Sequence, residues 1–352
     1  MKAFMKSNQI PGAVMAFSIN GTNVWTEGFG YTDIENNVET HKDSVFRIAS
    51  MSKSLTSALV GQLMDRHLID LNAEIHKYLS KDFYPFKTFN GSAVNMTVRQ
   101  VMSHTAGLYR GITVEDFDKL LLRRADNVSH TIPPFNDEPL IYKPGTNWSY
   151  SNYGYQMVGA LIESILDNTY ENEMQKMFTQ LNMNSTFAER REAIYKHRPQ
   201  YYHLSDGTSG TLVKCDMLDD LISYEGYWPA GGLISSAEDI LRFGNAMISS
   251  YKGTNGFLSQ STVEELWSPE TRGMIIPPLN TSEYAKGWAI VKDPGPFKEV
   301  IWHAGDLTGV STTFKLYPAE NMVAVAYVNM GGLFVELEEF TIKVANMFKD
   351  IL

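Results

Sequence analysis

Ser50 and Lys53, three positions apart, have the types and spacing of a nucleophile and its base. An apolar stretch leads into Ser50 and apolar residues recur at helical spacing after Lys53, so residues 50–67 are predicted to form an amphipathic helix. Ser50 would begin this helix, where unpaired backbone N–H groups and the helix dipole favour developing negative charge. A lysine one turn along projects from the same face, so the pair predicts an activated serine.

The S-x-x-K pattern alone is weak evidence for catalysis. The chain contains it again at Ser249 and Lys252, just before a loop signal. Serine is also a favoured helix N-cap, and a lysine one turn later is ordinarily a solvated surface residue. The interpretation of Ser50 therefore depends on residues elsewhere in the chain.

Tyr150 and Asn152 lie just before a predicted helix over 152–167. The tyrosine could serve as a proton shuttle if a neighbouring ammonium lowers its pKa from about 10. An asparagine side chain is donor and acceptor together, so Asn152 could bind both the lysine and a substrate amide. The competing interpretation is a helix N-terminus whose aromatic residues only pack, since Y-x-N occurs twice more in the chain.

His303, Gly305 and Asp306 lie between two predicted strands late in the chain. Gly305 would let a substrate backbone lie close against an edge strand. The N–H of Asp306 could join that of Ser50 in an oxyanion hole, and His303 could orient the substrate or assist proton transfer. The alternative is an ordinary hairpin turn that contains a histidine and a glycine.

The order of the predicted elements indicates how these residues come together. Strands are predicted near both chain ends and helices in the middle, which favours an antiparallel sheet flanked by terminal helices, with an inserted helical lobe. We expect an α+β fold (an α/β sandwich) as one domain over 1–352, with a sheet lobe from 1–50 and 230–352 and a mainly helical lobe from 51–229. The predicted strands are 12–20, 24–30, 286–291, 299–302, 311–317 and 322–328, and the predicted helices include 50–67, 97–103, 115–124, 152–167, 170–181, 240–248 and 333–351.

The composition argues against several classes of function. A formal net charge of −10 and the lack of a dense Lys/Arg run argue against nucleic acid as a partner. No apolar run approaches the ~20 residues that span a bilayer. With Cys215 as the single cysteine, no internal disulfide or cysteine metal cluster can form, and the eight histidines lack zinc-binding spacing. We expect no metal and no cofactor.

The three motifs together match a known family. S-x-x-K opening an early helix, Y-x-N in the helical middle and H-x-G on a late strand follow the order of the serine penicillin-recognising enzymes. The sequence resembles the β-lactamase and penicillin-binding-protein family, in particular its class C β-lactamase and D-amino-acid peptidase group, over nearly the whole chain. Within that family, IASMSKSLT and Gly244–Met247 look most like the animal mitochondrial members. Further supporting stretches are GFGY at 28–31, VMSHTAGL at 101–108, KPG at 143–145 and AGGLISS at 230–236.

The resemblance implies a role for each matching position. Ser50 would be the acylated nucleophile, with Lys53 and Tyr150 as the proton-transfer pair. Asn152 would help to bind the substrate. The implied fold is the β-lactamase/transpeptidase-like sheet flanked by helices, with the site in the cleft beside the helical lobe.

The third motif and one connection depart from parts of the family. His303 and Gly305 would form the edge-strand motif, but the β-lactamases proper carry lysine at the histidine position, which weakens the case for binding a β-lactam carboxylate. The esterase-like and animal members share the histidine. The animal mitochondrial members also carry a long charged insertion that this chain lacks between Gly107 and Lys143, which puts filament assembly in doubt and leaves homo-oligomer formation open. His104 is expected to be structural rather than a base.

The resemblance predicts a serine acyl hydrolase, peptidase- or β-lactamase-like, that forms a covalent acyl-enzyme with an amide or ester. Lys53, its pKa lowered by burial and by nearby positive charge, would accept the Ser50 proton directly or through Tyr150, which would then protonate the leaving group. The alternatives are an esterase acting on a different acyl donor and a non-catalytic scaffold that keeps the fold. The expected partner is a small-molecule or peptide substrate.

The compartment has two interpretations. The resemblance implies mitochondria, and a targeting segment could lie outside this sequence. N-x-S/T sequons favour the secretory pathway instead, although MKAFMKSNQIPGAV lacks the apolar region of a signal peptide. The sequons are at Asn20, Asn90, Asn95, Asn127, Asn147, Asn184 and Asn280.

Overall fold

The computed structural model describes residues 1–111, 126–207, 210–215, 226–254, 256–271 and 283–349. The predicted helix over 115–124 lies outside these residues.

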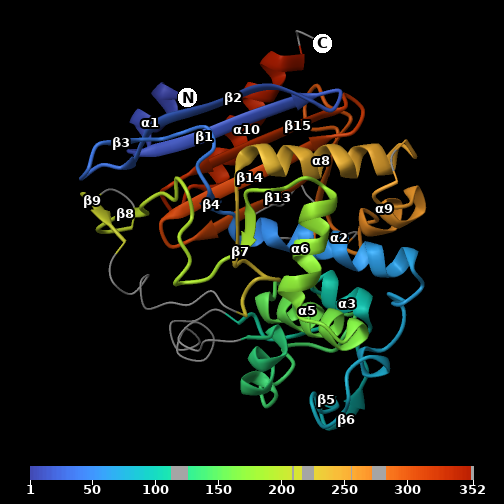
Figure 1. Ribbon diagram of the computed structural model, residues 1–352. Helices are drawn as coiled ribbons and strands as arrows, with labels where there is room; N and C mark the ends of the chain where they lie inside the picture. Colours follow the sequence, from blue (N-terminus) through green and yellow to red (C-terminus); the bar gives the residue numbers. More distant parts are fainter. Residues whose placement is uncertain (112–125, 208–209, 216–225, 255, 272–282, 350–352) are drawn as a thin grey trace.

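An antiparallel sheet joins the two ends of the chain (Figure 1). Its order in the described residues is β11-β12-β13-β14-β15-β1-β2-β3, so the N-terminal hairpin lies beside the last strand. β1 pairs with β15 from Ala13 opposite Val328 to Ile19 opposite Met322. The predicted sheet built from both chain ends is therefore confirmed. Its strands are β1 (Gly12–Ile19), β2 (Thr22–Asp33), β3 (Val38–Glu39), β11 (Glu283–Tyr284), β12 (Ala289–Lys292), β13 (Glu299–Leu307), β14 (Val310–Tyr317) and β15 (Met322–Val328).

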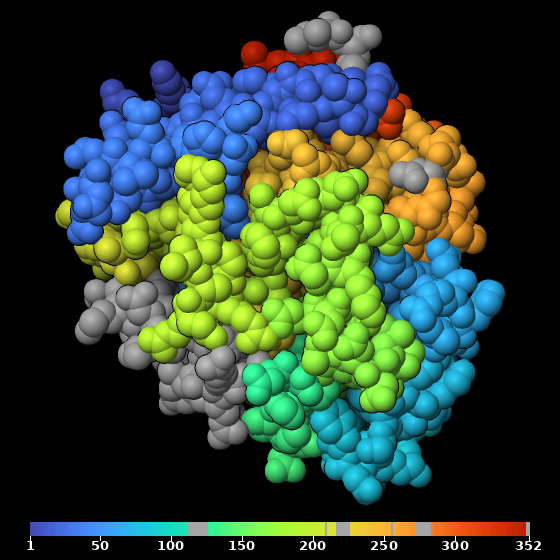
Figure 2. Space-filling model, in the orientation of Figure 1, coloured from blue at the N-terminus to red at the C-terminus, as the bar shows by residue number. Residues whose placement is uncertain are grey.

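Helices cover both faces of this sheet. The described helices are α1 (Lys2–Ser7), α2 (Ser52–Asp65), α3 (Val98–Met102), α5 (Asn152–Leu166), α6 (Tyr170–Gln180), α8 (Ala237–Tyr251), α9 (Gln260–Leu266) and α10 (Phe334–Lys349). Along β1, Val14 and Ala16 belong to a core shared with α2, α5 and α8, whereas Ala13, Met15 and Phe17 pack on the side of α1 and α10. The alternation is the period of two expected for a strand buried on both faces. Figure 2 shows the blue N-terminal strands packed beside α8, far away in sequence.

Short strands connect the sheet to the helical part. The strand that leads toward Ser50, β4 (Phe46–Arg47), pairs with β10 (Leu233–Ser235), which also pairs with β7 (Thr186–Ala188). Through this small sheet, the end of AGGLISS pairs with the segment that leads into η1, the turn that contains Ser50. The remaining short elements are β5 (Lys87–Phe89), β6 (Ser92–Val94), β8 (Tyr202–Leu204), β9 (Leu212–Lys214) and the 3-10 turns η1 (Ala49–Met51), η2 (Ile75–Lys77), η3 (Val128–Thr131) and η4 (Pro133–Phe135).

Two predicted strand boundaries near the third motif are wrong. The strand predicted over 286–291 begins only at Ala289, as β12, because the chain turns back at Gly287, whose φ of +87° favours glycine. The strand on the other side of this turn, β11, lies before the predicted range. The strand predicted to end at Trp302 continues to Leu307, because β14 pairs with β13 along its length. The His303 motif therefore lies inside a strand rather than between two strands.

None of the helices in the described ranges has the length and apolar character needed to cross a bilayer.

A buried ion pair lies between α10 and the sheet. Glu338 Oε2 is 4.0 Å from Lys315 Nζ, and both side chains are buried. Burial raises the pKa of Glu338 to about 7, and the charge of Lys315 opposes the rise. Glu338 is therefore an acid whose proton is retained far above the usual range.

Glu338→Gln is expected to flatten the dependence of stability on pH. Because the folded-state pKa is raised, the contribution of protonated Glu338 is complete below about pH 4.5 and is lost as the pH rises through about 7. From this group the wild type should lose about 2–3 kcal/mol of unfolding free energy between pH 5 and pH 8. Chemical denaturation at both pH values, with the exposed Glu339→Gln as control, measures the difference. A wild-type slope in Glu338→Gln would contradict this account.

Candidate active site

Ser50 lies in a strained turn at the start of α2. The turn is η1, and α2 itself begins two residues later, at Ser52 rather than at the predicted Ser50. Ala49 adopts φ +47°, a left-handed conformation that is unfavourable for alanine. Met51 N–H donates to the Ile48 carbonyl at 3.2 Å. This turn leaves Ser50 partly exposed although both of its neighbours are buried.

Lys53 is fully buried and makes three hydrogen bonds that define the site. Its Nζ lies 3.1 Å from Ser50 Oγ and 2.7 Å from Asn152 Oδ1. The third contact is the Ala230 carbonyl, at 2.5 Å. The structure thus brings together three predicted residues: Ser50 of η1, Lys53 of α2 and Asn152, the first residue of α5. Ala230 escaped prediction as a site residue, because it contributes only a backbone atom that no side-chain type can signal.

Burial lowers the pKa of Lys53 well below its ordinary value. A neutral amine has two N–H groups and one lone pair. Asn152 Oδ1 and the Ala230 carbonyl can only accept, so they bind the two N–H groups. The lone pair is then left for the Ser50 hydroxyl, which is the arrangement a general base requires.

Tyr150 packs over the amine as a protonated phenol. Lys53 Nζ is 4.8 Å from its ring centroid. Burial raises the pKa of Tyr150, and the smaller effects of Ser50 and Arg110 oppose the rise without reversing it. The condition set for a proton shuttle, a pKa of Tyr150 lowered by a neighbouring ammonium, is therefore not met. Among the described residues, its buried hydroxyl has no hydrogen-bond partner of normal geometry, so it is free to donate to a bound molecule.

His104 holds the loop that carries Tyr150. Its carbonyl accepts the Ser149 N–H at 3.0 Å, and its Nδ1 accepts the Ser151 N–H at 3.1 Å. Its ring packs on the Tyr150 ring with centroids 4.3 Å apart. These contacts fit the structural role expected for this histidine.

Gly305 lies where β13 packs against η1, the turn that contains Ser50. A Cβ at this position would overlap the Ile48 carbonyl, and would lie 2.5 Å from Thr312 Oγ1 and 2.8 Å from Ala49 Cβ. The glycine is therefore required by the packing of the turn against the strand, before any substrate is considered. In the described residues, β12 pairs with β13 only up to Trp302, so the strand edge beyond it is open beside Ser50.

Gly305→Ala is expected to lower the free energy of unfolding by about 2–3 kcal/mol, because backbone atoms rather than flexible side-chain ends must move. Any activity that depends on Ser50 should fall with the stability, since the displaced turn contains Ser50. Denaturant unfolding and turnover of the same preparation measure both effects. Ala304→Gly, one residue earlier, is the control for glycine content. Wild-type stability in Gly305→Ala would show that the turn does not press on this strand.

The other third-motif residues have partners of their own. The Asp306 carboxylate accepts from Ser311 Oγ at 2.8 Å and from the Gly332 N–H at 2.8 Å. Its backbone N–H as an oxyanion donor stays a prediction. The His303 ring is buried and bonded at both nitrogens, to Tyr284 at 3.0 Å and to the Ala304 carbonyl at 2.6 Å. Sequence reasoning missed Tyr284, which lies outside the predicted strands and belongs to no motif.

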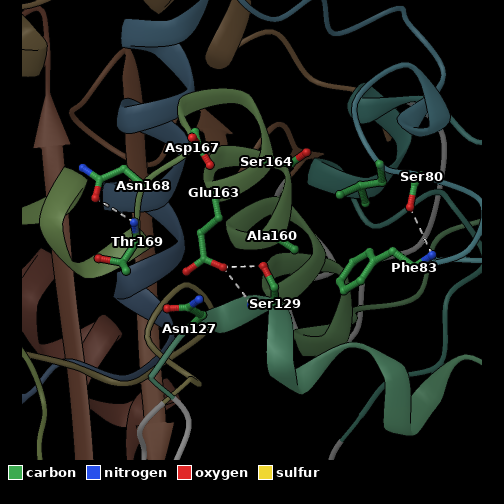
Figure 3. Close-up of a pocket in the computed structure, with 11 residues that line it drawn as sticks. Ser80, Phe83, Asn127, Ser129, Ala160, Glu163, Ser164, Asp167, Asn168 and Thr169 are labelled. Carbon is green, nitrogen blue, oxygen red and sulfur yellow. Dashed lines mark hydrogen bonds between the residues drawn. The ribbon is translucent and has the colours of Figure 1, made fainter.

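A separate hollow of about 520 Å³ lies beside α5 and shares no residue with this site (Figure 3). Its Glu163 carboxylate accepts from the N–H groups of Val128 at 3.0 Å, Ser129 at 2.9 Å and Tyr170 at 3.0 Å. It also accepts from the Ser129 hydroxyl. A carboxylate with these partners holds η3 against α5. Within the described ranges, no group of three His, Cys, Asp or Glu side chains is placed to hold a metal ion.

Comparisons with known proteins agree with the geometry. The human "Serine beta-lactamase-like protein LACTB, mitochondrial" is 26% identical over 392 residues, covering 88% of this chain and 69% of that protein.

Three solved structures share the fold. The octameric penicillin-binding protein homologue from Pyrococcus abyssi has 20% identity and a TM-score of 0.76 and covers 93% of this chain and 71% of its own. The D-stereospecific amidohydrolase from Streptomyces has 21% identity and a TM-score of 0.75 and covers 93% and 91%. EstCE1, a hydrolase with promiscuous acyltransferase activity, has 15% identity and a TM-score of 0.78 and covers 95% and 92%.

These structural neighbours confirm the expected β-lactamase/transpeptidase-like fold. The sequence model of the Beta-lactamase family matches residues 1–341. That match spans nearly the whole chain, including Ser50, Lys53, Tyr150 and His303. The chain therefore belongs to the β-lactamase family.

Proposed function

We propose that this chain is a serine acyl hydrolase that forms a covalent acyl-enzyme at Ser50 with an amide or ester. The observation that carries the proposal is the hydrogen-bond geometry of Lys53, whose two acceptors leave its lone pair for the Ser50 hydroxyl. A scaffold has no need for a desolvated amine beside a partly exposed serine, because burying such a group lowers stability.

Acylation can be written with these residues alone. Ser50 Oγ forms a bond to the acyl carbon while its proton moves to the Lys53 amine. The carbonyl electron pair moves onto oxygen, where the N–H groups of Ser50 and Asp306 are proposed to stabilise it. As the bond to the leaving group breaks, Tyr150 donates its proton to that group and regains one from Lys53. A water then attacks the acyl carbon by the reverse route, releasing the acid and restoring Ser50.

We propose a neutral amide or ester as the acyl donor, because such a substrate does not require a positive charge at His303. His303 is buried, and this burial lowers its pKa to about 3, so the ring is neutral at physiological pH. A β-lactam carboxylate therefore finds no positive charge there. Among the structural neighbours, one is named an amidohydrolase and one a hydrolase with acyltransferase activity, which agrees with a neutral amide or ester.

A substrate panel tests the proposal. Initial rates are measured with a nitrophenyl ester, an amino-acid nitroanilide and a chromogenic cephalosporin, using Ser50→Ala as the blank. We expect the ester or the anilide to be turned over faster than the cephalosporin. No turnover of any of the three above the blank would contradict the proposal, and preferred turnover of the cephalosporin would contradict the proposed substrate class.

We propose a mitochondrial location, supported by the name of the human relative. Fractionation of cells that express the full-length protein, followed by a test for glycans, distinguishes this location from the secretory pathway suggested by the sequons.

We also propose that the chain self-associates, supported by the octameric state named for the Pyrococcus abyssi homologue. Light scattering on the purified protein gives its mass, and a monomer at all concentrations tested would contradict self-association.

A further inference from the structure

A row of hydrogen bonds runs from Ser151 to Ala304 and includes the two buried histidines, His104 and His303. It starts at an obligatory donor, the Ser151 backbone N–H, which lies 3.1 Å from His104 Nδ1. That nitrogen must accept, so the neutral His104 ring carries its proton on Nε2. The Nε2–H group then donates to the Tyr284 hydroxyl oxygen, at 3.2 Å.

The other end of the row is fixed independently by an obligatory acceptor. The Ala304 carbonyl lies 2.6 Å from His303 Nδ1, so this nitrogen carries the proton of the second ring. His303 Nε2 is then an acceptor, and the Tyr284 hydroxyl lies 3.0 Å from it. The single proton of Tyr284 is available for this bond, because the oxygen already accepts from His104. The two ends of the row therefore independently require the same direction of donation, from His104 to Tyr284 and from Tyr284 to His303. This arrangement of the protons is called the proton order below.

We propose that Tyr284 is a positioning residue that joins His104 and His303 into one oriented relay, which holds both rings neutral in opposite tautomers beneath Tyr150. A proton added to His104 would set its Nδ1–H against the Ser151 N–H, and a proton added to His303 would set its Nε2–H against the Tyr284 O–H. The relay and the neutral state of both rings therefore support each other. Burial also lowers the pKa of both histidines. His303 is then a structural end of this relay, with neither ring nitrogen free to bind a substrate.

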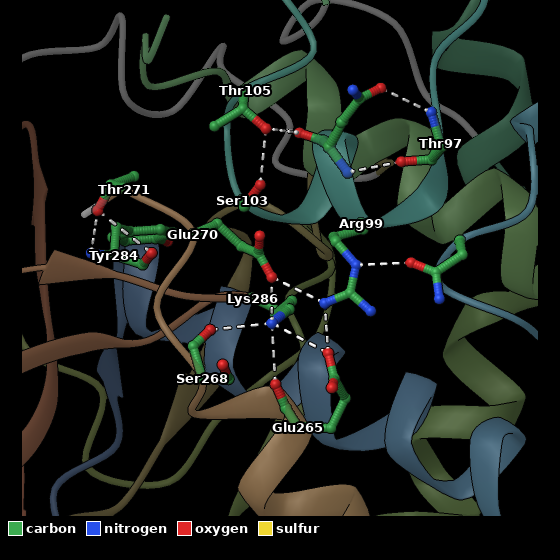
Figure 4. A network of polar contacts seen from close by, with 12 residues as sticks. Thr97, Arg99, Ser103, Thr105, Glu265, Ser268, Glu270, Thr271, Tyr284 and Lys286 are labelled. Atoms are coloured by element: carbon green, nitrogen blue, oxygen red, sulfur yellow. Dashed lines mark hydrogen bonds and ion pairs between the residues drawn. The ribbon is translucent and has the colours of Figure 1, made fainter. Parts of the chain in front are cut away.

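The backbone of Tyr284 is fixed by hydrogen bonds on both its N–H and its carbonyl group (Figure 4). The Tyr284 N–H donates to Thr271 Oγ1 at 2.7 Å, and its carbonyl accepts the Glu270 N–H at 2.9 Å. Glu270 in turn accepts from Arg99 of α3 at 2.7 Å and pairs with the buried Lys286 at 2.6 Å. Because α3 leads directly to His104, this network fixes both the start and the middle of the relay.

The relay also packs against Tyr150, the proposed proton donor to the leaving group. The Tyr150 ring contacts Tyr284 edge-on, with centroids 6.3 Å apart, and lies 6.4 Å from the His303 ring. Loss of the relay should therefore loosen Tyr150 and slow acylation. This kinetic consequence rests on the proposed function, whereas the proton order does not.

Nitrogen NMR of histidine-labelled protein reads the proton order directly. In the wild type at neutral pH we expect His104 as the Nε2–H tautomer and His303 as the Nδ1–H tautomer, each assigned with a His→Gln variant. Tyr284→Phe keeps the ring but removes the hydroxyl, and should change the His303 signals and slow acylation by a fluorophosphonate about tenfold. Tyr153→Phe is the matched control, because this tyrosine is also buried but its hydroxyl donates to the Ile132 carbonyl at 3.2 Å, outside the relay.

The result that overturns the proposal is a wild type in which either ring is charged at neutral pH or carries its proton on the other nitrogen. Unchanged His303 signals in Tyr284→Phe would overturn it as well. If Tyr284→Phe does not fold, the wild-type spectrum decides alone. Correct tautomers in a protein that no probe acylates would leave the relay in place and contradict the proposed function instead.

Discussion

Ser50→Ala is expected to reduce turnover of any ester or amide substrate by about 10⁴-fold or more, because it removes the atom that bonds to the acyl carbon. The remaining groups of the site can still bind a substrate, so its affinity should change little. The fold should survive, since Ser50 is partly exposed and Lys53 keeps its other two hydrogen-bond partners, Asn152 and the Ala230 carbonyl. Steady-state kinetics and denaturant unfolding of the same variant measure the two effects.

The chain supplies its own matched control in the second S-x-x-K pattern. Ser249 lies near the C-terminal end of α8, and Lys252 is the exposed residue that caps that helix. The same S-x-x-K pattern therefore occurs at the C-terminal end of a helix, where the lysine amine is exposed. Ser249→Ala should keep wild-type turnover. Equal losses in the two serine variants would mean that the Ser50 site is not the seat of catalysis.

Lys53→Met is expected to slow acylation by about 10³-fold, because it removes the base while keeping an apolar side chain of similar length. The variant should fold, since the change also removes an amine whose burial disfavours its charged form. A stopped-flow measurement of acylation by an activated ester separates this step from hydrolysis of the acyl-enzyme. Lys252→Met on the surface is the control.

The pH profile gives a second signature of Lys53. Its pKa is lowered by burial, so the neutral amine becomes available below the pH at which an ordinary lysine loses its proton. In the wild type kcat/KM should rise with pH as this amine deprotonates, and Lys53→Met should lack that rise. A variant that acylates at the wild-type rate would exclude the proton-transfer role.

The motifs could be predicted because their residue types carry the chemistry. Ser50, Lys53 and Asn152 were separable from chance matches only as a set in a fixed order along the chain. The structure bonds these three side chains to one another. The sheet from both chain ends was equally predictable, since its long strands carry the apolar alternation and turn residues that define a strand.

Other features of the site depend on contacts between distant segments. The left-handed φ of Ala49 and the need for glycine at 305 arise where two distant segments meet. The rise in the pKa of Tyr150 follows from burial, which a loop sequence does not report. Tyr284 has no motif at all. Its role comes from standing between two histidines that lie about two hundred residues apart in the chain.

The central claim is that Ser50 is an acylable nucleophile, and the most direct test is the intact mass of the protein after exposure to a fluorophosphonate or a penicillin-type probe. We predict one adduct per chain with the fluorophosphonate, located by peptide mapping on the peptide that contains Ser50 and absent from Ser50→Ala. No adduct under conditions that label an active member of the family, or an adduct that persists in Ser50→Ala, would contradict the claim.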